Sequence, residues 1–163
     1  MRNYFVYVFF IVALFSGCIK GDTTQEVCNY DPCLQKAPAS EIDAVKTYLN
    51  SQSITAEQHC SGLFYIIDAA GSGGTPTICD YIVAKYKGNF TNGNVFDQGQ
   101  FSSPIQLNNL IAGWKNGIPL IRKGGKIRLF IPPSLGYGSQ AYPSTSNPVI
   151  PANSILIFEV ELL

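Results

Sequence analysis

The chain has little charge and no run of it. Of its 163 residues, 13% are charged, and 11 basic residues balance 11 acidic ones. Proteins that bind nucleic acids need a concentrated positive surface to attract the phosphate backbone. No such patch stands out, so the sequence argues against nucleic-acid binding. Aromatic residues make up 12% of the chain, which favours a well-packed core.

The apolar segment at the start is too short to cross a membrane. Residues 4–15 form an uncharged apolar run of 12 residues, whereas a membrane-spanning helix needs about 20. The run follows Arg2, as in an export signal. It ends at Phe15-Ser16-Gly17-Cys18, and small residues before a cysteine are typical of a bacterial lipoprotein signal.

We therefore predict a lipoprotein signal peptide at residues 1–17, with Cys18 lipidated and anchored to a membrane. Residues 18–38 are polar and are predicted to form a tether. Ile19, and not an acidic residue, follows the cysteine, which favours the outer membrane of a bacterial envelope, on its periplasmic or surface face. The alternative is an ordinary cleaved signal peptide that contains Cys18 by chance.

Histidine is almost absent, and no CxxC pair occurs. The four other cysteines are Cys28, Cys33, Cys60 and Cys79. An even number in an exported chain suggests disulfides. We prefer Cys28–Cys33, across a turn-like stretch, together with Cys60–Cys79. A zinc site is the alternative, although the one histidine, His59, does not lie at ligand spacing from the cysteines.

A leader helix is predicted before the main domain. Residues 39–50 carry an apolar stripe at helical spacing, with Ser40 as the expected N-cap. The stripe consists of Ile42, Val45, Tyr48 and Leu49. We expect it to pack on the domain, and a dimer contact is the alternative. Residues 39–60 are assigned to this helix and its linker.

The rest of the chain predicts an antiparallel sheet with one short helix. Strands are expected at residues 63–68, 78–87, 126–132 and 154–162, and a helix at 110–116. Alternation of apolar and polar residues along the strands implies that one sheet face lies on the core. Together these elements predict an α+β fold.

The opposite face of this sheet is more apolar than a solvated face requires. Tyr81, Val83, Phe130 and Ile157 should all point away from the core. We predict that the leader helix covers part of this face.

Five segments in the last hundred residues together form one connected pattern. They are ICDYIVAKYKG, NGNVFDQ, LIAGWKNGIPLI, KIRLFIPPSLGYG and SILIFEVEL. Together they resemble the FK506-binding-protein (FKBP) type of peptidyl-prolyl cis-trans isomerase. The resemblance covers residues 61–163, which we assign to an isomerase domain. It implies a twisted antiparallel sheet wrapped around one short helix.

The resemblance also implies a set of site residues. Trp114 would be the pocket floor, the other aromatic rings its walls, and Asp97 a carboxylate at its edge. The implied catalytic residues are Tyr86, Phe96, Asp97, Trp114, Tyr137 and Phe158. The implied substrate-binding residues are Ile105, Leu107, Ile111, Tyr142, Val149 and Ile150. Ile105 and Leu107 depart from the family because aromatic side chains are usual at both positions.

The activity implied is rotation of Xaa-Pro peptide bonds in exported proteins, with no metal or cofactor. The implied partners are proline-containing unfolded or extended polypeptides and FK506-like macrolides. A binding module or chaperone without significant catalysis is the first alternative, kept open by the long loop at residues 139–148. A structural, disulfide-stapled surface protein is a third hypothesis, but it does not explain the pocket residues.

Overall fold

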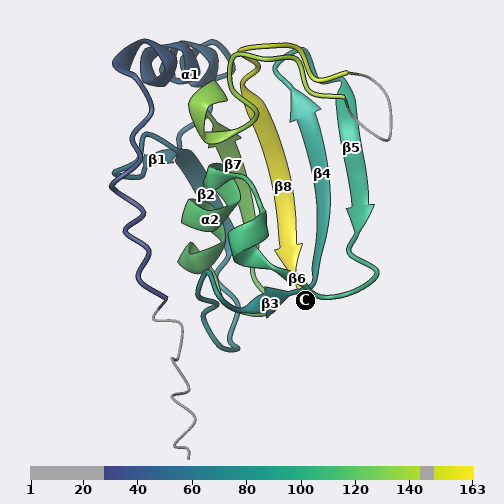
Figure 1. Ribbon diagram of the computed structural model, residues 1–163. Helices are drawn as coiled ribbons and strands as arrows, with labels where there is room; N and C mark the ends of the chain where they lie inside the picture. Colours follow the sequence, from purple (N-terminus) through teal and green to yellow (C-terminus); the bar gives the residue numbers. More distant parts are fainter. Residues whose placement is uncertain (1–27, 144–148) are drawn as a thin grey trace, which may run out of the picture.

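The computed structural model describes residues 28–143 and 149–163. The predicted signal peptide and Cys18 lie outside these residues. Helices and strands follow one another as shown in Figure 1. Their bounds are α1 Ala39–Ser51, β1 Glu57–Gln58, β2 Phe64–Ala69, β3 Tyr81–Ile82, β4 Ala84–Phe90, β5 Val95–Gln100, β6 Ile105–Gln106, α2 Ala112–Gly117, β7 Lys126–Ile131 and β8 Leu156–Leu162.

Six of the strands form one antiparallel sheet in the order β1-β2-β7-β8-β4-β5, and β3 pairs separately with β6. Figure 1 shows α2 lying across one face of the large sheet and α1 at one end of it. The predicted α+β architecture is confirmed. Over the part of the chain described, no helix combines the length and the apolar character that crossing a bilayer requires.

Three predicted strands and both helices form within a few residues of the expected bounds. The predicted strand at 78–87 is divided at Val83, because its first part pairs with β6 and its second part with β5 and β8. Ser40 is not the N-cap of α1. The helix begins at Ala39, and the Pro38 carbonyl accepts the first N–H groups, from Glu41 and Ile42.

The main core lies between α2 and the large sheet. Close approach of the helix depends on two glycines. A Cβ added at Gly113 would lie 2.6 Å from the Ile131 side chain, and one at Gly117 would lie 2.5 Å from Leu129. Because both glycines lack that atom, α2 can sit directly on β7.

A second core lies on the other face of the sheet, under α1. Val45 and Leu49 of the helix pack with Phe64, Phe130 and Ile157. We call this region the covered half of the outer face. The prediction that the leader helix covers Phe130 and Ile157 is confirmed. Tyr81 is not covered: its side chain is 68% exposed, because β3 belongs to the smaller sheet.

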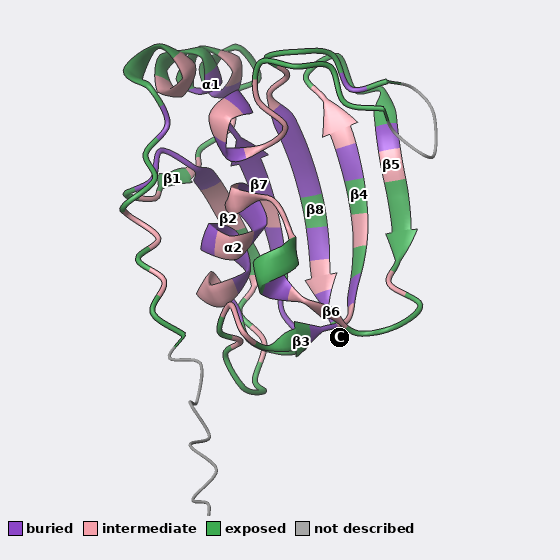
Figure 2. Ribbon diagram, in the orientation of Figure 1, coloured by how far each residue is buried: buried purple, intermediate pink, exposed green. Residues whose placement is uncertain are grey.

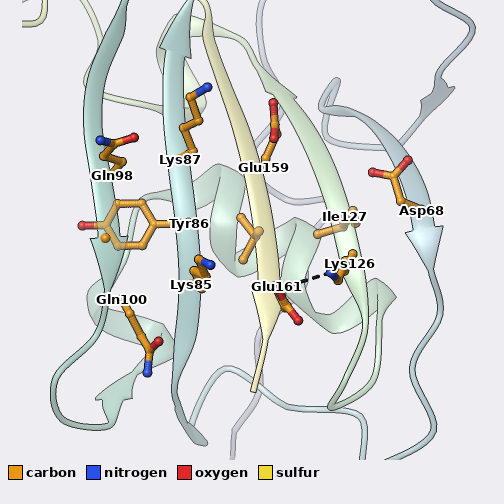
Figure 3. Close-up of a pocket in the computed structure, with 12 residues that line it drawn as sticks. Asp68, Lys85, Tyr86, Lys87, Gln98, Gln100, Lys126, Ile127, Glu159 and Glu161 are labelled. Atoms are coloured by element: carbon orange, nitrogen blue, oxygen red, sulfur yellow. Dashed lines mark ion pairs between the residues drawn. The ribbon is translucent and has the colours of Figure 1, made fainter.

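The remainder of the outer face, which we call the open half, is charged. It forms a shallow groove of about 670 Å³ whose charged and polar side chains come from five neighbouring strands, with α2 behind the sheet (Figure 3). These side chains are Asp68, Lys85, Lys87, Gln98, Gln100, Lys126, Glu159 and Glu161. The strand register sets Lys85 opposite Glu161 and Lys87 opposite Glu159. Opposite charges on adjacent strands are typical of a solvated sheet face.

The segment at residues 28–38 does not form a free tether. Disulfides join Cys28 to Cys79 and Cys33 to Cys60. The Tyr30 hydroxyl donates a hydrogen bond to Asn116 Oδ1 at 2.6 Å, which fixes the segment to α2. From residue 28 onward, the predicted tether therefore belongs to the folded domain.

The preferred disulfide pairing was wrong, although all four cysteines are bonded. Asp31 starts a turn in which its Oδ1 accepts the Cys33 N–H at 2.8 Å. Cys28 lies in the stretch before this turn. It is bonded to Cys79, whereas Cys33 is bonded to Cys60 in a different loop of the domain. A pairing between distant loops cannot be deduced from a local turn signal. Because all four cysteines are paired with one another, they are also not zinc ligands.

Candidate active site

Four aromatic side chains from four elements meet on the inner face of the sheet. Tyr86 comes from β4, Phe96 from β5, Trp114 from α2 and Phe158 from β8. The Trp114 and Phe158 ring centroids are 5.4 Å apart at 84°, and those of Phe96 and Phe158 are 5.4 Å apart at 89°. Edge-to-face packing at these distances favours fixed ring positions.

The backbone of β4 allows this cluster to close. Gly88 pairs with Asp97 on one side and with Phe158 on the other. A Cβ at Gly88 would lie 2.5 Å from the Phe96 ring and 3.0 Å from that of Phe158. Only glycine therefore leaves room for both rings at this position.

Asp97 is held at the edge of the cluster by Tyr86. The Tyr86 hydroxyl donates to Asp97 Oδ2 at 3.1 Å. Burial, followed by the negative charge of Asp97 and this hydrogen bond, raises the pKa of Tyr86 to about 12. The phenol therefore stays protonated near neutral pH and remains a hydrogen-bond donor to the carboxylate.

Trp114 lies in the first turn of α2. Ile111 is the N-cap, and its carbonyl accepts the Trp114 N–H at 2.9 Å. The Ile111 N–H makes no hydrogen bond to any residue that the structure describes, and its side chain is half-buried. This N–H is thus a candidate donor to a bound peptide carbonyl.

Tyr137 and Tyr142 stack on each other. Their ring centroids are 4.3 Å apart, and the planes are inclined by 22°. Burial raises the pKa of the Tyr137 hydroxyl, with smaller contributions from Tyr142 and Asp97, so this group also stays protonated. Tyr142 and Ile150 exchange two backbone hydrogen bonds of 2.9 Å, which bring the ends of the intervening loop together.

The residues expected to bind substrate differ in their surroundings. Ile150 is buried beside Tyr142, whereas Val149 is 54% exposed. Ile105 is half-buried and pairs with Ile82 in the small sheet. Leu107 has no exposed surface and packs in the main core.

Phe101, which directly follows β5, also belongs to the cluster, and it is not among the residues predicted from the sequence. Its ring centroid lies 5.3 Å from that of Tyr86 and 5.8 Å from that of Trp114. Only its proximity to the FDQ segment could have drawn attention to it.

Metal binding has no support in the described ranges, where no three His, Cys, Asp or Glu side chains are grouped to hold an ion. The groove of the open half is lined mainly by charged and polar side chains, and Tyr86 of the aromatic cluster also lines it (Figure 3). The aromatic cluster is therefore the candidate active site.

The fold and this cluster match one known class of α+β domain. The family model for FKBP-type peptidyl-prolyl cis-trans isomerases matches residues 73–163, and the chain belongs to that family. It is 49% identical, over 107 residues, to the FKBP-type peptidyl-prolyl cis-trans isomerase FkpA of Buchnera aphidicola, a match that covers 63% of this chain and 40% of that one.

Solved structures agree with this assignment. The crystal structure of FkpA from Escherichia coli aligns with a TM-score of 0.63 and 36% identity, covering 77% of this chain and 59% of that one. The structure of AtFKBP13 aligns with a TM-score of 0.58 and 31% identity, covering 66% and 96%. The chain spans about two fifths of the length of the curated FkpA relatives that it matches.

Proposed function

We propose that the chain is a peptidyl-prolyl cis-trans isomerase that rotates Xaa-Pro bonds in exported proteins and so assists their folding. The arrangement of rings carries this proposal. Tyr86 and Phe158 stand edge-on to the Trp114 indole, with centroids 5.8 and 5.4 Å away, and Asp97 lies at the edge of this cluster.

The reaction requires no nucleophile or metal. Rotation about the peptide bond breaks amide resonance, with a barrier of roughly 18–20 kcal/mol. The twisted amide is less polar than the planar one, because its nitrogen no longer donates electrons to the carbonyl. An apolar, water-poor pocket therefore stabilises the twisted state more than the ground state, which is the requirement for catalysis.

Polar groups around the pocket would hold the flanking peptide. The Ile111 N–H would donate to a substrate carbonyl, and the protonated Tyr137 hydroxyl would donate to another. Asp97, fixed by Tyr86, would face the carbonyl of the twisting bond. Tyr142, Val149 and Ile150 would border the same site.

The substrates proposed are unfolded or extended polypeptides that contain proline. Uncatalysed prolyl isomerisation takes roughly 10–100 s, so an envelope catalyst would speed folding. FK506-like macrolides would compete for the same apolar pocket. Two disulfides support an oxidising, extracytoplasmic location. The proposal includes a lipid on Cys18 and anchoring in the bacterial envelope, at the outer membrane.

A cis-to-trans assay with Xaa-Pro peptides tests the activity, using the full chain in detergent. Asp97→Val should lower kcat/KM about ten- to a hundredfold, because a hydrogen bond to a charged group is lost. Phe158→Tyr should lower kcat/KM by adding a hydroxyl to a closely packed ring site. Thermal unfolding of each variant serves as the folding control.

Two results would contradict this proposal. If the folded chain binds proline peptides and shows no turnover, it is a binding module. If both variants keep full turnover, the site is misplaced. Cys18→Ser tests the anchor separately: the variant should leave the membrane fraction, and its retention there would exclude lipid attachment at this residue.

A further inference from the structure

We propose that Glu41 of α1, together with Gln35, is a positioning residue for Tyr137 because it holds the short turn that precedes this tyrosine. The inference rests on the proposed isomerase function and deepens it, since the Tyr137 hydroxyl is the donor proposed for the substrate backbone. Glu41 and Gln35 both lie before residue 73, where the match to the family model begins.

Two hydrogen bonds from these residues converge on the backbone of Ser134. Its N–H donates to Glu41 Oε2 at 2.8 Å, and its carbonyl accepts from Gln35 Nε2 at 3.2 Å. Ser134 lies in the 3-10 turn Pro133–Leu135, which follows β7 and lies next to α1 (Figure 1). The first N–H groups of such a turn have no acceptor within it, and a carboxylate is a strong acceptor for them.

The same turn carries Tyr137. The Pro133 carbonyl accepts the N–H groups of Gly136 at 2.9 Å and of Gly138 at 2.8 Å, the residues on either side of Tyr137. The side chain of Leu135 is fully buried. The backbone of residues 133–138 is therefore one hydrogen-bonded unit, and a rotation of this unit would move the Tyr137 ring and its hydroxyl.

The helix that supplies Glu41 is fixed to the domain at its start. The Ala37 N–H donates to the Ser61 carbonyl at 2.8 Å, just before α1 begins. A Cβ added at Gly62 would lie 2.7 Å from the Ile42 side chain, so the helix and this loop are in close contact. Glu41 therefore holds the turn from a rigid support.

The Tyr137 hydroxyl needs this constraint. A donor contributes most to catalysis when it is in place before the substrate binds. Ring stacking alone does not fix Tyr137, since its stacking partner Tyr142 is 48% exposed. The bonds to Ser134 add a second constraint, and through them the segment before residue 73 acts on the site.

Glu41→Ala tests the proposal, with Asp43→Ala as the matched control. Asp43 is also an acidic residue of α1, but it is exposed and pairs with Lys46 of the same helix at 3.9 Å. Kinetics are measured with an Ala-Leu-Pro-Phe peptide on the full chain in detergent. Glu41→Ala should lower kcat/KM about three- to tenfold, because a displaced donor contributes less to the reaction. Asp43→Ala should leave kcat/KM unchanged, and Glu41→Gln should restore most of it, since the amide oxygen can accept the Ser134 N–H.

Combination with Tyr137→Phe separates positioning from a general loss of stability. In that background the hydroxyl is already absent, so Glu41→Ala should lower kcat/KM no further. NMR gives a readout that does not depend on turnover. In Glu41→Ala the Ser134 amide proton should exchange faster with solvent, and cross-relaxation between the Tyr137 and Tyr142 rings should weaken.

An unchanged kcat/KM in Glu41→Ala, an equal loss in Asp43→Ala, or the same loss in the Tyr137→Phe background would overturn the proposal. If Glu41→Ala does not fold, Gln35→Ala replaces it in every comparison, because it removes the other hydrogen bond from an exposed side chain. A wild-type chain without turnover contradicts the isomerase function alone. The NMR result then decides, and an unchanged contact between the Tyr137 and Tyr142 rings would overturn the positioning role.

Discussion

The covered and open halves of the outer sheet face differ in chemistry although the same strands build both. β2 presents Phe64 and then Asp68, while β8 presents Ile157 and then Glu161. β7 runs in the opposite direction and presents Lys126 before Phe130. Each of the three strands is therefore apolar where α1 lies and charged where it does not. The apolar or charged character of the strand residues therefore shows which part of the sheet a helix covers.

The helix that covers this face lies outside the part of the chain that matches the family model. The matched family region begins at residue 73, whereas α1 ends at Ser51. Phe130 and Ile157 lie within the family region, but their cover lies outside it. In Figure 2 the side of α1 that faces the sheet contains the buried positions, which indicates that the helix is an integral part of this domain.

Among the variants of the outer face, Phe130→Ala should cause the largest loss of stability. The side chain is buried under α1, and its removal leaves a cavity. We expect a loss of about 3–5 kcal/mol in the free energy of unfolding. Denaturant titration measures the loss, and Tyr81→Ala, at a largely exposed aromatic, is the control. A small loss would mean that the covered half is not a true core.

Leu49→Ala shortens a side chain of α1 that packs on the same covered half. We expect a loss of about 2–5 kcal/mol, because the buried leucine fills space against the sheet. The double variant with Phe130→Ala should lose less than the two single losses combined, since both residues belong to one cluster. Full additivity would show that α1 and the sheet are energetically independent.

Arg128→Ala tests the open half. Arg128 Nη2 lies 2.9 Å from Asp68 Oδ1, and Nε also donates to this carboxylate. Both groups are partly exposed, so we expect a loss of only about 0.2–1 kcal/mol. The loss should shrink in high salt. A loss as large as that of Leu49→Ala would show that the open half stabilises the fold as much as the covered half does.

Lys126→Ala should have the smallest effect. Its ion pair with Glu161 spans 3.4 Å between exposed side chains. Such pairs often contribute nothing measurable. Thermal unfolding at low salt should therefore match that of the wild-type chain within error, and a clear decrease would indicate that the charged groove stabilises the fold.

The sequence predicted those features that repeat along it. Alternation identified β2, β7 and β8, and helical spacing identified the stripe of α1. β5 escaped because only Phe96 of its six residues is buried, as expected for a strand at the sheet edge. The cysteine pairing and the position of Phe101 depend on contacts between distant segments. The motif residues could be named because their spacing is specific in combination, whereas Leu107 could be placed only once its burial was known.

The Cys28–Cys79 bond sets how far an anchored domain could travel. Only nine residues lie between Cys18 and Cys28, which the disulfide holds against the domain. Even fully extended, the ten steps from residue 18 to residue 28 reach about 35 Å. With a lipid at Cys18, the catalyst would work within a thin layer beside the bilayer. It would then meet chains that emerge at that surface at high local concentration and would leave the rest of the compartment to diffusing enzymes.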